Sequence, residues 1–427
     1  MSKLAINGGK PLRDKPFVEW PVFEHEEEEA LLGVLRSGKW WRFAFGQGVE
    51  MIEPEKGDRS QVVLFQEEFA RHHQCKYGIA GANGTATLEI GIRALDFDVG
   101  DEIIAPAYTY VGSVTCMLQN NLVPIFVDVD RNTYNIDPDR IEEAITDRTR
   151  AIMAVHFGGQ PADLDRIMSI AEKHGLAVIE DAAHAHGCEW RGKKAGSFGI
   201  FSSFSFQASK NMTSGEGGII CTDDKTLAIE CDSLVWSGRY PGRPWYEFHR
   251  LGWNYRLTEF QGAILRVQLR RLEQQVRHRE KMARYLTAKF ETIDGITPLT
   301  HDQRTTLHGY HIYMFRYDEK SIGLSRKKFL SALEAEGIPV FYGYTYPLYK
   351  NPMFLDKKFI NGAFPLGTQY HDDIDYRSFE EKCPVSEQAC KSEAVWMPQN
   401  IFLGTEKDMD DIFEAAKKVL GNKNALT

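Results

Sequence analysis

From about residue 76 onward, the chain alternates short β-type runs with segments of helical periodicity. Apolar positions crowd together in the β-type runs, whereas in the helical segments they recur every three or four residues. Regular alternation of this kind requires crossover connections and predicts a mostly parallel sheet covered by helices on both faces. The predicted strands are Tyr77–Ala80, Glu102–Ala105, Val123–Val127, Ala151–Val155 and Ala177–Glu180, and the predicted helices are Thr85–Leu95, Gly112–Gln119, Pro138–Ile145 and Leu164–His174.

A long helical pattern, from Leu257 to about Ile293, ends this alternation. Strand and helix patterns then follow in mixed order, which is typical of a smaller α+β domain. We therefore expect an α/β chain of two domains, residues 1–255 and 256–427. The elements predicted in the second domain are strands Ile312–Tyr317 and Val340–Tyr342 and helices Arg326–Glu336 and Asp408–Leu420.

The N-terminal region has a different pattern. The acidic run Glu24–Glu29 precedes an apolar stretch and indicates the first turn of a helix, where the dipole favours negative charge. The next segment, residues 37–42, breaks that helix and carries Trp40 and Trp41, whose rings either pack or form a binding wall. Residues 46–60 are polar and predict a surface excursion.

Composition narrows the classes of protein. The 427 residues are 43% hydrophobic and 26% charged, which is the balance of a globular chain. The net charge of −9 disfavours nucleic acid or an anionic membrane as the partner. No apolar run reaches the roughly 20 residues of a membrane span, and the start lacks the apolar core of a secretion signal, so we expect a cytoplasmic protein. Seven scattered cysteines without CxxC spacing indicate reduced thiols and no metal site.

Three segments carry candidate chemistry. Ser205 lies five residues before Lys210, and a glycine-rich turn follows. Upstream, an apolar strand pattern ends in the carboxylate of Asp181. Further upstream, Gly84 and Thr85 stand where a turn enters a helix, so that free N–H groups and the positive helix end face an anion such as phosphate.

Pyridoxal phosphate chemistry needs these parts together. A lysine amine forms a Schiff base, and a carboxylate keeps the pyridine nitrogen protonated so that the ring withdraws electrons. Each part has an ordinary explanation on its own: a surface lysine, a helix-capping aspartate, or a plain helix start. Their joint occurrence in one chain favours the cofactor site.

Five motifs then identify the sequence as similar to the DegT/DnrJ/EryC1/StrS aminotransferases, which have the aspartate aminotransferase fold (fold type I). The resemblance extends from about Trp20 to the C-terminus and fits least well around residues 46–60. The matching stretches are Asn83-Gly84-Thr85, Pro106 to Tyr110, Glu180 to Ala185, Ser205 to Lys210, and Gly252 to Arg256.

The resemblance implies a role for each matched residue. Gly84, Thr85 and Ser205 would bind the cofactor's phosphate, and the ring of Tyr110 would stack on the pyridine ring. Asp181 would bind the pyridine nitrogen, His184 would lie near the phenolic oxygen, and Lys210 would form the Schiff base. Asn254 would reach the phosphate held by the partner subunit, which implies a homodimer with composite sites. The implied catalytic residues are Lys210 and Asp181.

Within the family, residues 37–42, 181–187 and 204–207 look closest to 3-amino-5-hydroxybenzoate synthase and the aminocyclitol aminotransferases. The expected activity is amine transfer from glutamate or glutamine to a keto-sugar or keto-cyclitol. Two alternatives stay open: an aromatising dehydratase of the aminohydroxybenzoate synthase type, and a non-catalytic regulator that binds the cofactor.

Some residues have no assigned role from sequence. His156 follows a strand end and either lines the cleft or belongs to the core. Arg42 and the tyrosines at 342, 344 and 346 are candidates for binding a polyol through hydrogen bonds and ring faces.

Overall fold

A computed structural model describes residues 3–45 and 59–426. Its centre is a seven-stranded sheet in which the strand order is β1-β9-β8-β5-β4-β2-β3. Strand β9 runs antiparallel to both of its neighbours, and the other strand pairs are parallel. The strands are β1 (Tyr77–Gly81), β2 (Glu102–Pro106), β3 (Val123–Val127), β4 (Thr149–Val155), β5 (Ala177–Asp181), β8 (Phe201–Ser205) and β9 (Gly218–Thr222). The five strands predicted for the first domain are confirmed.

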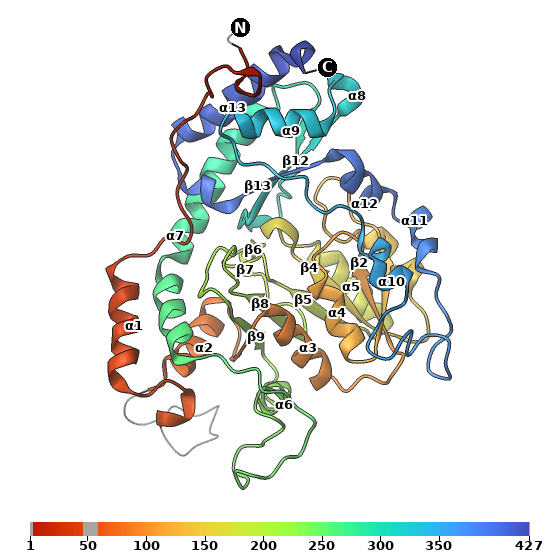
Figure 1. The fold of residues 1–427 in the computed structure, drawn as a ribbon. Helices are drawn as coiled ribbons and strands as arrows, with labels where there is room; N and C mark the ends of the chain where they lie inside the picture. The colour runs from red at the N-terminus through yellow and green to blue at the C-terminus, as the bar shows by residue number, and fades with distance from the viewer. Residues whose placement is uncertain (1–2, 46–58, 427) are drawn as a thin grey trace.

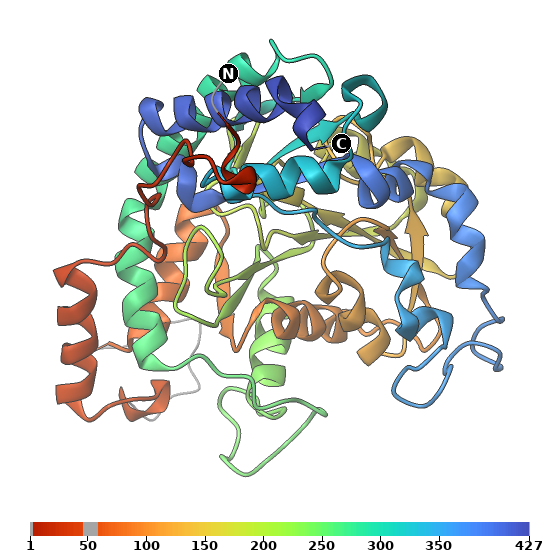
Figure 2. The same cartoon turned by 45° about the horizontal axis from the view of Figure 1, so that its top comes forward.

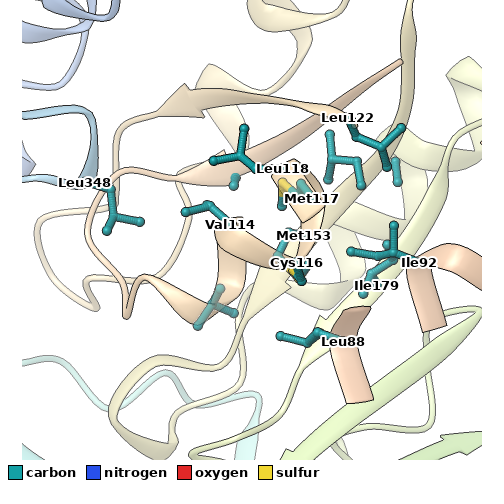
Figure 3. Packing of buried hydrophobic residues seen from close by; sticks show 14 of the residues in the cluster. Leu88, Ile92, Val114, Cys116, Met117, Leu118, Leu122, Met153, Ile179 and Leu348 are labelled. Atoms are coloured by element: carbon teal, nitrogen blue, oxygen red, sulfur yellow. The ribbon is translucent and has the colours of Figure 1, made fainter. Parts of the chain in front are cut away.

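Both faces of this sheet are buried, as the run-like hydrophobic pattern predicts. Consecutive residues of β2 illustrate this burial, because Ile103 belongs to the core on one face of the sheet and Ile104 to the core on the other. Helices α3 (Gly84–Ala94), α4 (Gly112–Gln119) and α6 (Lys225–Val235) share the first face, where apolar residues of α3 and α4 pack against β4 and β5 (Figure 3). Helices α2 (Gln61–His72), α5 (Leu164–His174) and α7 (Glu259–Phe290) pack on the opposite face.

Helix α7 runs beside both halves of the molecule (Figure 1). Its N-cap is Thr258, whose hydroxyl accepts the Gln261 N–H, while the Gln261 side chain accepts the Thr258 N–H. This capping box starts the helix two residues later than the sequence pattern suggests. Helix α1 (His25–Ser37) packs against α7 and begins after Glu24, so the helix start predicted from the acidic run is confirmed.

The C-terminal part builds a second, antiparallel sheet in the order β10-β12-β13. Its strands are β10 (Ile296–Pro298), β12 (Ile312–Tyr317) and β13 (Ala394–Pro398), and the longer helices that share its core are α9 (Arg326–Ala335) and α13 (Glu406–Gly421). The shorter elements are β6 (Glu189–Trp190), β7 (Lys193–Lys194), β11 (Thr305–Leu307), α8 (Glu319–Ile322), α10 (Pro352–Leu355), α11 (Phe379–Lys382) and α12 (Pro384–Gln388).

The N-terminal residues pack with this C-terminal part (Figure 2), where the Asn7 side chain donates to the Ala425 carbonyl at 3.2 Å. Leu4 belongs to the same core as α9 and α13. The buried carboxylate of Glu336 accepts the backbone N–H groups of Ala5 and Leu12, at 2.9 and 2.8 Å. The division into residues 1–255 and 256–427 stays a prediction.

Two predicted elements are wrong. The segment Pro138–Ile145 forms two 3₁₀ turns, Pro138–Arg140 and Glu142–Ala144, and two buried residues, Pro138 and Ile141, anchor it. The segment Val340–Tyr342 forms a single bridge, from Phe341 to Trp396, before a glycine with positive φ turns the chain away. The surface excursion predicted for residues 46–60 lies outside the described residues except at positions 59 and 60. No described helix is long and apolar enough to cross a membrane.

A buried carboxylate, Glu180, fixes the loop that leads into β8. It accepts the backbone N–H groups of Gly196, Phe198 and Gly199, each at 2.7 Å. His156 Nε2 lies 2.9 Å from it, and His156 Nδ1 accepts the Ala162 N–H, so Nε2 is the donor. His156 therefore belongs to the core and not to the cleft.

We expect Glu180→Ala to destabilise the fold by about 3 kcal/mol or more, because it leaves buried donors without an acceptor. Burial raises the pKa of Glu180, but the hydrogen bonds from His156 and the loop outweigh it and the pKa is lowered. Its contribution is therefore present above the unfolded pKa of about 4.3 and is lost as the pH falls through the folded pKa.

Urea unfolding at neutral pH measures the change, and Glu172→Ala, at an exposed position of α5, is the control. Glu180→Gln keeps one acceptor oxygen and should lose less than Glu180→Ala. Equal midpoints for Glu180→Ala and Glu172→Ala would contradict the structural role.

Candidate active site

The turn that enters α3 has the form of an anion cradle. The Asn83 side chain caps the helix by accepting the Ala86 N–H at 2.9 Å. The first helical turn, which begins at Gly84, has N–H groups without partners inside the helix. A Cβ at Gly84 would lie only 2.7 Å from the Cβ of Ser205, so the turn and the end of β8 touch. The three residues expected to bind phosphate, Gly84, Thr85 and Ser205, are thus supplied by one compact corner.

Tyr110 belongs to the same corner. A Cβ at Gly112 would lie 2.7 Å from Thr85 Oγ1 and 3.0 Å from the Tyr110 ring, which places the ring and the hydroxyl around one glycine. Tyr110 is 59% exposed, so the residue is accessible to a ligand in this corner. This geometry fits the stacking role that the sequence suggests.

Asp181 ends β5 and is buried. Ser113 of α4 donates its hydroxyl to Asp181 Oδ2 at 2.6 Å, and the Ala183 N–H donates to Oδ1 at 3.2 Å. Thr109 Oγ1 lies 3.1 Å from Ser113 Oγ, so a second hydroxyl positions the one that holds the carboxylate. The carboxylate is therefore fixed, and charged acceptors of this kind make strong hydrogen bonds.

Lys210 lies in a short loop after β8 that its own neighbours order. Gln207 holds the loop, because its side chain accepts the Ser209 N–H and its carbonyl accepts the Lys210 N–H, at 2.8 and 2.9 Å. Lys210 is half-buried. Loss of water around it lowers the pKa of Lys210 to about 8, and the negative charge of Asp181 acts in the opposite direction.

His184 faces the same region in its neutral form. Burial and then the charge of Lys210 hold the pKa of His184 well below its usual range. Its Nδ1 accepts the Gly158 N–H at 3.3 Å, and its ring lies 4.2 Å from the ring of His311. His311 in turn lies 3.1 Å from Asn211, the residue after Lys210.

Sequence reasoning missed Ser113 and His311. Ser113 gives no signal beyond its position on a helix four residues after Thr109, and His311 lies about a hundred residues from the lysine. Arg42, a candidate for the cleft, is instead buried in an ion pair with Asp232 at 3.0 Å.

Asn254 lies in the segment between α6 and α7. It is exposed and bridges the backbone of Trp236 beyond the end of α6. Among the described residues, no group of three or more metal-ligating side chains is present.

Comparison with known proteins identifies the family and the fold. The sequence profile of the DegT/DnrJ/EryC1/StrS aminotransferase family matches residues 55–376. A protein of Streptoalloteichus tenebrarius, for which L-glutamine:3-amino-2,3-dideoxy-scyllo-inosose aminotransferase activity is suggested, is 39% identical over 100% of this chain and 99% of its own. The L-glutamine:2-deoxy-scyllo-inosose aminotransferase of Streptomyces kanamyceticus is 36% identical over 100% of this chain and 98% of its own.

The 3-amino-5-hydroxybenzoate synthase of Amycolatopsis mediterranei is 33% identical over 92% of this chain and 94% of its own. A crystal structure of 3-amino-5-hydroxybenzoic acid synthase superposes with a TM-score of 0.83 at 30% identity, covering 95% of this chain and 99% of that chain. The expected fold, that of the pyridoxal-phosphate-dependent transferases, is confirmed.

The lowered pKa of Lys210 predicts how the protein takes up an aldehyde, because only the neutral amine attacks. The rate at which cofactor-free protein incorporates pyridoxal phosphate should rise through about pH 8 and then level off. Rapid-mixing absorbance across a pH series measures this midpoint.

Asp181→Asn should move that midpoint to lower pH, because the charge of Asp181 raises the pKa of Lys210. A midpoint near the ordinary lysine value of about 10.4 in the unchanged protein would contradict the assignment.

Proposed function

Because the chain belongs to the DegT/DnrJ/EryC1/StrS aminotransferase family, we propose that it transfers an amine from glutamine or glutamate to a keto-cyclitol or keto-sugar through pyridoxal phosphate bound to Lys210. The observation that supports this proposal is the environment of Lys210. The side chain is half-buried, burial lowers the pKa of Lys210 to about 8, and the charge of Asp181 acts on it in the opposite direction. A lysine in that state forms a covalent bond with an aldehyde near neutral pH.

The residues around Lys210 fit the cofactor. Gly84, Thr85 and Ser205 would hold the phosphate, and Tyr110 would cover the ring. Asp181 would bind the pyridine nitrogen, with its carboxylate steadied by Ser113. When bound, the cofactor supplies an electron-withdrawing ring that lowers the barrier to removing a proton beside the amine.

The chain's own groups supply the proton steps. Lys210, once released from the cofactor, can accept a proton at Nζ and return it nearby, and its lowered pKa suits a general base near neutral pH. His184 is neutral and its Nδ1 accepts the Gly158 N–H, so its Nε2–H can donate one hydrogen bond near the ring without adding charge to the site. Charge in the corner is thereby left to Asp181 and Lys210.

The full-length similarity to aminocyclitol aminotransferases supports a keto-cyclitol acceptor and glutamine as donor. The superposition on 3-amino-5-hydroxybenzoic acid synthase supports a second candidate, an aromatising dehydratase that uses Lys210 as a base. The retained Lys210–Asp181 pair argues against a purely regulatory protein. The cytoplasmic location expected from the sequence stays a prediction.

We also propose that the active unit is a homodimer. The segment between α6 and α7 extends away from the rest of the molecule (Figure 1) and carries Asn254. Large apolar side chains are exposed along it, and exposed patches of this kind mark protein interfaces. They are Trp245, Tyr246, Phe248 and Leu251, with exposed fractions of 40%, 82%, 53% and 86%. A two-fold axis here would let Asn254 serve the partner's phosphate.

We expect the protein loaded with pyridoxal phosphate to convert its cofactor to the amino form with L-glutamine, and then to aminate 2-deoxy-scyllo-inosose. Lys210→Ala should lower turnover by about 100-fold or more, since it removes both the attachment point and the base. Lys225→Ala, at an exposed lysine, should turn over normally. Absorbance follows the first step and mass spectrometry the product.

The two half-reactions separate the alternatives. Conversion of the cofactor without amination of any cyclitol or sugar ketone would refute the acceptor class. An aromatic product formed with no amine donor would favour the dehydratase, and no change with either glutamine or glutamate would refute amine transfer.

Shared sites predict complementation between two inactive chains. Lys210→Ala and Asn254→Ala, each severely impaired alone, should regain activity after subunit exchange, because one site of a mixed dimer receives both defects and the other receives none. The recovered rate should reach at most about half of the wild-type rate per mixed dimer. Differential tags allow the mixed dimers to be purified and counted.

The control is a mixture in which both partners carry Lys210→Ala, which should stay inactive. If verified mixed dimers of the two variants are also inactive, Asn254 does not serve the partner's site.

A further inference from the structure

The short segment between β11 and β12, residues 309–311, touches three loops at the carboxyl edge of the large sheet. In the loop after β4, the Gly159 carbonyl accepts the Gly309 N–H at 2.8 Å. In the loop after β8 that carries Lys210, which we call the lysine loop, the side chain of Asn211 donates to the Gly309 carbonyl at 2.7 Å. In the loop after β5, the Sγ of Cys188 would lie 2.7 Å from a Cβ at Gly309. The C-terminal part of the chain therefore packs directly against the candidate site.

The tautomer of His311 follows from its contact with Asn211. The Asn211 amide nitrogen donates to Gly309, so its Oδ1 faces His311 Nδ1, at 3.1 Å. An amide oxygen only accepts hydrogen bonds, so His311 Nδ1 carries the hydrogen and donates it. Among the described residues, no second group donates to Asn211 Oδ1, and the two side chains are only 1% and 7% exposed. Removal of the His311 donor would therefore leave a buried oxygen unsatisfied.

The ring of His311 also supports His184. The two ring centroids lie 4.2 Å apart, and the ring planes make an angle of 37°. His184 Nδ1 accepts the Gly158 N–H, so the ring is held by one hydrogen bond at its edge and by His311 at its face. One histidine thus contacts both the lysine loop and the loop after β5.

The proton affinity of Lys210 depends on how far its loop excludes water. The titratable and charged groups that act in this region are Asp181, His184, His186, Arg279 and His311. Burial lowers the pKa of all three histidines, so they are uncharged at neutral pH. Loss of water lowers the pKa of Lys210, and the charge of Asp181 opposes it. Water that reached the amine would stabilise the ammonium form and raise the pKa of Lys210.

We propose that His311 is a positioning residue that holds the lysine loop in the site through Asn211 and supports the His184 ring, an inference that rests on the proposed aminotransferase function. Asn211 follows Lys210 directly, so its hydrogen bond with His311 fixes the backbone from which the lysine side chain extends. On the other side, the Gln207 carbonyl accepts the Lys210 N–H at 2.9 Å. Without the donor of His311, this loop is held on one side less, and water gains access to the amine.

The test follows uptake of the cofactor and not amine transfer. Rapid-mixing absorbance across a pH series measures the midpoint at which cofactor-free protein incorporates pyridoxal phosphate, about 8 for the wild type. His311→Phe keeps a ring beside His184 but removes the donor to Asn211. We expect its midpoint to rise by about one pH unit or more, toward the ordinary lysine value of about 10.4, because the amine is better hydrated.

His311→Asn is the conservative variant, since its side-chain N–H can replace that of Nδ1. Its midpoint should stay close to the wild-type midpoint. Asn211→Ala removes the same hydrogen bond from the other side and should raise the midpoint as His311→Phe does, and the double variant should shift no further than either single variant. His174→Phe, the same substitution at an exposed position of α5, is the control and should leave the midpoint unchanged.

Two results would overturn the proposal. One is a wild-type midpoint in His311→Phe or, if that variant does not fold, in Asn211→Ala. The other is a midpoint in His311→Asn as high as in His311→Phe, because the aromatic ring and not the hydrogen bond would then control the lysine. Urea unfolding checks that each variant is folded.

The result is separable from the proposed function. If the midpoints shift as expected but the wild type never converts its cofactor with glutamine or glutamate, the positioning role stands and amine transfer fails. If the cofactor is converted and the midpoints coincide, amine transfer stands and His311 contributes packing alone.

Discussion

The structure depends on two consecutive carboxylates at the end of β5. Successive side chains of a strand point to opposite faces of the sheet, so Glu180 and Asp181 face opposite ways. Glu180 has a structural role, since it accepts three backbone N–H groups and a hydrogen bond from His156. Asp181 faces α4, where Ser113 holds it. A shift of one residue in this strand would exchange the two roles and remove both the loop anchor and the site carboxylate.

The same strand explains why distant motifs meet. Strands β2, β4, β5 and β8 are parallel, so their carboxyl ends lie at one edge of the sheet, where ligands bind in open α/β folds. The segments that leave these ends carry Tyr110, Gly158, Asp181 and Lys210. The cradle at α3 closes the corner because Gly84 touches Ser205. Each site residue thus stands in a local turn or strand end, and the topology of the sheet brings these segments close together.

Sequence periodicity predicted the central strands well, because their apolar runs are buried on both faces. It missed β8 and β9, and β8 shows why. Three of its five residues are serines that are buried through hydrogen bonds. Ser202 donates to the Gly196 carbonyl, and Ser203 donates to the Gly84 carbonyl. A pattern of apolar positions cannot reveal a strand whose buried side chains are polar and form hydrogen bonds with other elements.

The candidate site could likewise be predicted only in part from the sequence. Residues in short motifs, such as Lys210 and Gly84, could be identified because the chemistry needs them at fixed spacing. Ser113 and His311 could not, because their relevance arises only when α4 and the segment before β12 fold against the motif residues. The wrong helix at Pro138–Ile145 has the same origin, because burial of Pro138 and Ile141 anchors two short 3₁₀ turns in a segment whose pattern resembles an amphipathic helix.

The electrostatic balance at Lys210 follows from these placements. Burial favours the neutral amine, and the charge of Asp181 favours the ammonium, so the pKa settles near 8, where both forms are available at neutral pH. The nearby histidines do not disturb this balance, because burial keeps His184 and His311 uncharged. Had either been protonated, its charge would push the lysine further toward the neutral form and weaken the influence of Asp181. The packing that keeps these rings uncharged therefore leaves the proton affinity of the lysine to its own burial and to Asp181.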